Sequence, residues 1–96
     1  MEADNYSIER ELGCLLEKYT GVETDSVSEE IARQKIAAYI HDLMGEGRGR
    51  LLSFMYLVDV KESLFQLIIK GYPEEEWPLL LADLVLKRLL EKVYTR

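Results

Sequence analysis

The sequence has little of the residue types that carry most protein chemistry. Its 96 residues include one cysteine, one histidine, one tryptophan and two prolines. The lone Cys14 excludes a disulfide within the chain and fits a reducing compartment. Residues 1–4 are polar and acidic, the reverse of a secretory signal, and no apolar run approaches the roughly 18 residues that span a bilayer. We therefore predict a cytoplasmic protein with no membrane segment.

Candidate ligands and catalytic groups are equally scarce. His41 has an alanine and a glycine four residues to either side, so no second ligand shares its helix face, and a metal site needs several converging ligands. Asp59 and Asp83 lie in apolar surroundings, but Asp59 can cap a helix and Asp83 precedes Lys87 by four residues, a favourable ion-pair spacing. We predict no enzyme, no metal and no cofactor.

The charge balance argues against nucleic acid and anionic membranes as partners. The net charge is −6, and it is uneven. Residues 1–47 hold 11 acids and 4 bases, whereas residues 48–96 hold 7 acids and 8 bases. Residues 50–70 could be mistaken for a helix-turn-helix, but Lys61, Gln66 and Lys70 are too few outward polar groups to bind DNA.

Apolar spacing predicts helices from one end of the chain to the other. The first segment repeats with the period of one helix stripe, in Ile8, Leu12, Leu15, Leu16 and Tyr19. Within it, Gly13 costs about 1 kcal/mol relative to alanine and indicates close packing against another helix. Ser26 and Glu29 form a Ser-x-x-Glu capping box that starts a second helix, which Gly45 ends.

The glycine-rich residues 45–50 favour a flexible turn between helices. A phosphate-binding loop would require a Gly-Lys-Ser/Thr ending after a strand, and the segment has neither. Beyond it we predict two short helices over 50–58 and 60–70, the second capped by Asp59 with Glu62 at its third position. One continuous helix is the alternative, because no proline or glycine forces a break. A last helix begins near Trp77, after three glutamates that complement its dipole.

These elements predict the fold class. We expect an all-α protein, a small helical bundle of four to five helices, with residues 1–96 forming a single domain.

Two segments carry more apolar surface than a small bundle can easily hide. Residues 51–58 are apolar nearly all round the helix, and residues 79–86 over most of it. We therefore predict a protein–protein interaction or regulatory module, a homodimer or a binder of another protein, with Arg48 and Arg50 at the rim. The predicted interface residues are Leu52, Met55, Tyr56, Leu80 and Leu84.

Two other interpretations stay open at this point. Both segments can form the centre of a well-packed monomer. The chain can also be a small-molecule binder or enzyme with a pocket between helices, which would use Tyr39, Tyr56, Trp77 and Asp83.

The second half of the chain also resembles known sequences. The stretch Arg-Leu-Leu-Ser-Phe-Met-Tyr-Leu-Val-Asp-Val at residues 50–60, with Leu-Ala-Asp-Leu-Val at 81–85 and Lys-Val-Tyr-Thr-Arg at 92–96, is similar to small all-helical bacterial proteins of uncharacterised function. The resemblance implies a free-standing small helical protein and brings no activity and no site residues.

Overall fold

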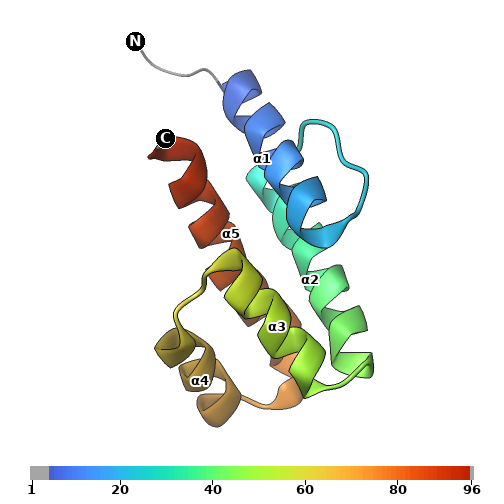
Figure 1. Ribbon diagram of the computed structural model, residues 1–96, viewed down its shortest axis with the longest axis vertical. Coiled ribbons are helices and arrows are strands. Elements are labelled where there is room, and N and C mark those ends of the chain that lie inside the picture. Colours follow the sequence, from blue (N-terminus) through green and yellow to red (C-terminus); the bar gives the residue numbers. More distant parts are fainter. Residues whose placement is uncertain (1–4, 96) are drawn as a thin grey trace.

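The chain folds as an all-α bundle, which confirms the predicted fold class. The computed structural model describes residues 5–95 and, within them, the side chains of residues 7–95. No strand occurs in that part of the chain. Its helices are α1 (Asn5–Thr20), α2 (Glu29–Gly45), α3 (Arg48–Val58), α4 (Glu62–Gly71) and α5 (Trp77–Tyr94), with the 3-10 turn η1 (Glu74–Glu76) leading into α5 (Figure 1).

The pair α2 and α5 forms the centre of the bundle. The two helices run in opposite directions and share the most extensive packing of any two elements (Figure 1). Each presents a stripe of small and branched apolar residues to the other, as period-3.6 spacing predicts. The core contributions are Ala32, Ile36, Ala37, Ile40 and Leu43 from α2, and Trp77, Leu81, Ala82, Val85, Leu86, Leu89 and Val93 from α5.

Helix α1 runs in the same direction as α2, because the connection between them returns along α1 (Figure 1). The amide of Val27 donates to the carbonyl of Glu9, 3.2 Å away, near the start of α1. Gly13 is buried, and a Cβ there would lie 1.6 Å from the carbonyl oxygen of Asp25. Gly13 therefore marks a close backbone contact, as predicted from the sequence. The contact is with this connection, however, and not with another helix.

Helix α2 begins later than the capping box predicts. Its N-cap is Ser28, whose hydroxyl accepts a hydrogen bond from the amide of Ile31, 3.2 Å away. The predicted cap, Ser26, lies in the exposed connection instead. Serine is a favoured N-cap residue at either position, and the path of the connection along α1 selects Ser28.

Two helices occupy residues 48–71, which rules out the single continuous helix. The break comes from Asp59, which has left-handed backbone angles (φ 74°, ψ 43°) and ends α3. Its amide donates to the carbonyls of Met55 and Tyr56, and the amide of Val60 also bonds Met55. The prediction that Asp59 caps the following helix is therefore wrong: Lys61 precedes α4, and it makes no capping bond with its side chain.

The turn between α2 and α3 is shorter than the glycine-rich stretch. Gly45 closes α2, Gly47 takes a positive φ of 113°, and α3 begins at the next residue. The two arginines of this stretch both contact side chains of their own chain. Arg48 lies over the ring of Trp77, 5.6 Å from its centroid, and Arg50 pairs with Glu46 at 3.2 Å.

Asp83 also differs from its predicted pairing. Its carboxylate binds the guanidinium of Arg33 through two hydrogen bonds and so connects α5 to α2. Lys87, the predicted partner, forms no ion pair with any described residue. The contact raises the pKa of Arg33, chiefly through the hydrogen bond to Asp83.

Candidate protein interface around α4

Helix α4 lies at the edge of the bundle and is the least buried of its helices. It packs against α3 and α5, at the lower left in Figure 1. Five of its ten residues are large and apolar, yet Phe65 alone among them is fully buried. Ile68 and Ile69 are half-buried, Leu64 is exposed, and Leu67 is the most exposed large hydrophobic side chain of the described residues, at 65%. An amphipathic helix therefore turns part of its apolar stripe to solvent.

A groove of about 500 Å³ separates the first turns of α4 from the second half of α5. Its apolar surface comes from Val60, Leu64 and Leu84, and charged side chains form its edges. Leu67 follows Leu64 by three residues, so it stands one helical turn from the groove on the same side of α4. We call Leu67 and the groove together the α4 face. The groove residues are Asp59, Val60, Lys61, Leu64, Leu84, Lys87, Arg88 and Glu91.

Ion pairs join the charged side chains along one side of the groove. The guanidinium of Arg88 contacts the carboxylates of Asp59 at 2.9 Å and of Glu91 at 3.3 Å. Its hydrogen bond to Asp59 is the main reason that its pKa is raised. Lys61 and Lys87 form no ion pair with any described residue, so two ammonium groups at the groove remain available to a partner.

Tyr56 borders the α4 face on the side of α3. It is 57% exposed, and its hydroxyl donates to the carboxylate of Glu62 at the start of α4, 3.2 Å away. This hydrogen bond, helped by the negative charge of Glu62, raises the pKa of the Tyr56 phenol, because loss of the proton would place two negative charges side by side. The contact attaches α4 to α3 at its exposed edge.

The predicted interface residues divide between the core and the neighbourhood of α4. Met55 is 1% exposed, so its placement in an interface is wrong: it faces the core of its own chain. Leu52 and Leu84 are half-buried against the same core, and Leu80 is half-buried on α5. Sequence reasoning missed Leu64 and Leu67 as interface residues. Their apolar stripe was visible in the sequence, but the sequence did not show that few other side chains cover them.

The residues of the alternative, a small-molecule pocket, do not come together. Tyr39 packs edge-on against Phe54, with ring centroids 4.9 Å apart, and Tyr56 is exposed on α3. The indole N–H of Trp77 donates to the carbonyl of Tyr72, 2.9 Å away, and Asp83 pairs with Arg33 on the surface. Of the five best-defined hollows among the described residues, none is lined by more than one of these four side chains.

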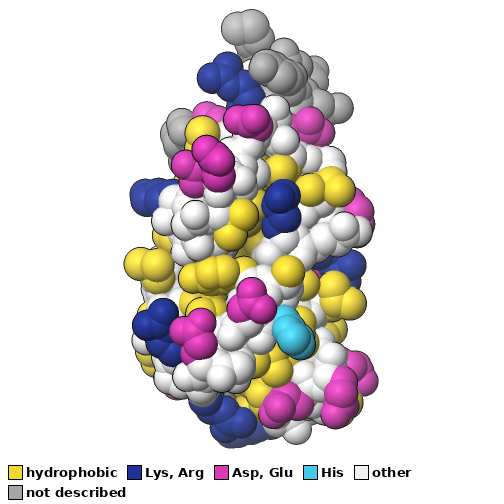
Figure 2. All heavy atoms as spheres, turned by 90° about the vertical axis from the view of Figure 1, so that its right-hand side faces the viewer, with side chains coloured by type: hydrophobic (Ala, Val, Ile, Leu, Met, Phe, Trp, Pro, Cys, Tyr) yellow, Lys and Arg dark blue, Asp and Glu magenta, His cyan; other side chains and the backbone are white. Residues whose placement is uncertain are grey.

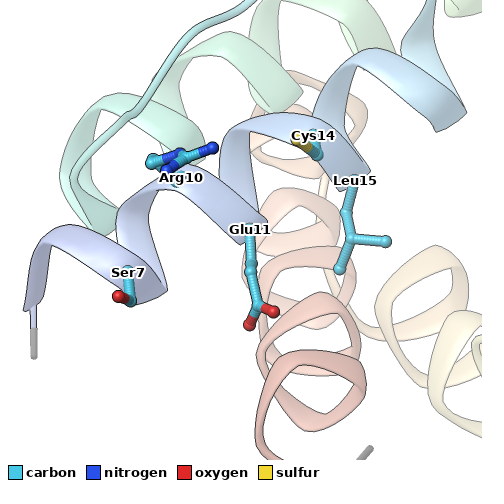
Figure 3. A pocket seen from close by; sticks show the side chains of 5 residues that line it. All are labelled: Ser7, Arg10, Glu11, Cys14 and Leu15. Carbon is cyan, nitrogen blue, oxygen red and sulfur yellow. The ribbon is translucent and has the colours of Figure 1, made fainter. Parts of the chain in front are cut away.

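A second hollow, of about 320 Å³, lies along α1 (Figure 3). Its lining residues all belong to one helix, and Glu11 and Leu15 point toward α5 while Arg10 and Cys14 point away from it. Because these side chains diverge, they do not converge on a common ligand. The hollow is lined by Ser7, Arg10, Glu11, Cys14 and Leu15.

The described residues hold no cluster of histidine, cysteine and acidic side chains that could bind a metal. His41 stands on the open surface of α2, cyan in Figure 2, on a face where charged and apolar side chains alternate. No described side chain buries an unpaired polar atom. Within residues 5–95, no helix combines the length and apolarity needed to cross a bilayer.

Comparison of the chain with protein-family models, with curated proteins and with solved structures finds no match in any of the three.

Proposed function

We propose that this chain is a protein–protein interaction module, without catalytic activity, whose α4 face joins two copies into a homodimer. The observation that carries the proposal is that Leu64 and Leu67, one turn apart on α4, are both exposed beside an apolar groove. Single exposed leucines are ordinary on protein surfaces, but two neighbouring exposed leucines next to a groove are typical of a surface that another protein covers. The free thiol of Cys14 is in keeping with a protein that acts in the cytoplasm, where thiols stay reduced.

Charge supports a second copy as the partner. Two molecules of net charge −6 repel each other over most of their surface. The groove and its α3 edge are an exception, because their three basic and three acidic side chains cancel. An interface with twofold symmetry brings a surface onto itself, so a surface without net charge is suited to self-association. The charged residues are Lys61, Lys87 and Arg88 against Asp59, Glu62 and Glu91.

The test is the mass in solution of three proteins: the natural chain, Leu67→Glu and the control Leu57→Glu. Leu57 is exposed to nearly the same degree, at 61%, but it lines a hollow on the α2 side of α3, away from α4. Size-exclusion chromatography with light scattering distinguishes about 22 kDa from the 11.2 kDa of one chain.

We expect the natural chain and Leu57→Glu to be dimers and Leu67→Glu to be a monomer. Burial of a leucine contributes about 1.5–3 kcal/mol, and a twofold interface loses it twice, so the dissociation constant should rise at least roughly 100-fold. A natural chain that stays monomeric at high micromolar concentration would overturn the proposal, as would equal dissociation of both variants.

A further inference from the structure

The α4 face carries both a projecting side chain and a groove. Leu67 projects from the second turn of α4, whereas Val60, Leu64 and Leu84 line the groove beside the first turn. The two features lie side by side on one surface, offset by one helical turn. A twofold rotation between two copies can therefore set each projection opposite the other copy's groove.

The groove suits an occupant that presents an apolar side chain to its base and polar groups around that side chain. Val60 at its base is 6% exposed, and Leu64 and Leu84 flank it, so a charged tip would lose its hydration there without a counter-charge at the base. Around the base, Lys61 and Lys87 offer ammonium groups, and the carboxylates of Asp59 and Glu91 surround Arg88.

The turn of α4 that carries Leu67 has this composition. The side chains three or four residues from Leu67 share its face of α4, and the polar ones are Ser63 and Lys70. The groove, of about 500 Å³, is large enough to admit a leucine side chain.

We infer that in the dimer the α4 helices exchange contacts, with Leu67 of each copy seated between Leu64 and Leu84 of the other. This inference rests on the proposed function and specifies its geometry. In a twofold interface the contact occurs twice, so the same three leucines serve as projection and as groove in both copies.

Disulfide trapping tests this arrangement in the full-length chain. Cys14 is exposed and is first replaced by serine, so that the introduced thiols alone can crosslink. Leu67→Cys in one chain is then mixed with Leu84→Cys in a second chain that carries a mass tag, under mild oxidation. Leu64→Cys replaces Leu84→Cys as a second groove position, because Leu64 is the more exposed and tolerates truncation better.

We expect a mixed dimer on a non-reducing gel, with loss of both monomer bands, because thiols in contact across the interface fall within disulfide reach. The matched control, Leu57→Cys mixed with the same tagged chain, should keep its monomer bands. Circular dichroism of each variant establishes that it is folded.

The outcomes separate the geometry from the proposed function. If light scattering shows a dimer but neither groove position crosslinks to Leu67→Cys above the Leu57→Cys control, this arrangement is wrong while self-association stands. If light scattering shows a monomer throughout, both proposals fail together.

Discussion

Single residues with an unusual backbone environment fix the connections of this bundle. Asp59 takes left-handed backbone angles that residues other than glycine rarely adopt, and it thereby separates α3 from α4. Gly13 is needed for a different reason. Its backbone is helical, but the carbonyl of Asp25 occupies the position where a Cβ would lie. One aspartate and one glycine thus decide where a helix ends and how closely a connection approaches.

At this scale we predict opposite effects for two glycine substitutions. Gly13→Ala should lower the free energy of unfolding by about 2 kcal/mol or more, because the connection must move away and its contacts with α1 are lost. Gly49→Ala should raise it by up to about 1 kcal/mol, since Gly49 lies in α3 with nothing within 4 Å of its Cβ position. Urea denaturation at one protein concentration measures both. A stable Gly13→Ala variant would show that the close contact does not exist in solution.

At the scale of helices, boundaries depend on caps that sequence rules identify only approximately. Ser26 fits the capping-box rule with Glu29, yet Ser28 is the residue that satisfies the amide of Ile31. The rule describes local backbone chemistry, and it does not contain the path of the preceding connection, which holds Val27 against Glu9 of α1.

The two serines provide a matched pair for α2. Ser28→Ala should cost about 1 kcal/mol of folding free energy, within the usual range of roughly 0.5–2 kcal/mol for an N-cap, because the amide of Ile31 loses its acceptor. Ser26→Ala should change stability by no more than a few tenths, since Ser26 is exposed in the connection. Thermal and urea unfolding of both variants would decide; a larger loss for Ser26→Ala would return the cap to the capping-box position.

Periodicity was sufficient for the class of fold and for the existence of every helix. It could not assign the break after residue 58 to Asp59, because left-handed angles at an aspartate leave no mark in the sequence. Nor could it separate Met55 from Tyr56. In a segment that is apolar nearly all round, the pattern does not reveal which side faces the core, and the structure buries the first and exposes the second.

Over the whole molecule, α4 changes the argument for a partner. The apolar circumference of residues 51–58 and 79–86 suggested more surface than one chain could cover, but α4 packs on both α3 and α5 and covers part of it. The surface in need of a partner therefore moves to α4 itself. Sequence reasoning named Leu84 of the α4 face, and Tyr56 at its edge, but it missed Leu67, because a stripe of apolar residues does not show how many neighbours a helix has.

Net charge leads to a prediction about salt. Copies of charge −6 repel at long range, while the groove together with its α3 edge has no net charge, so screening should remove repulsion without weakening the contact. Raising sodium chloride from about 50 to about 500 mM, which shortens the Debye length from roughly 14 to 4 Å, should leave the dimer equally tight or tighten it a few-fold. Sedimentation equilibrium measures the dissociation constant. Marked weakening by salt would point instead to an acidic surface that binds a basic one.

The central pairing of α2 with α5 has a consequence for how the chain folds. Residues 46–76 separate these helices, so their docking closes a loop of roughly 30 residues and costs entropy before the main core is gained. The loop contains α3 and α4, of 11 and 10 residues, which are too short to persist in water alone. The nucleus must therefore join distant parts of the chain at once, and the bundle forms cooperatively rather than one helix after another.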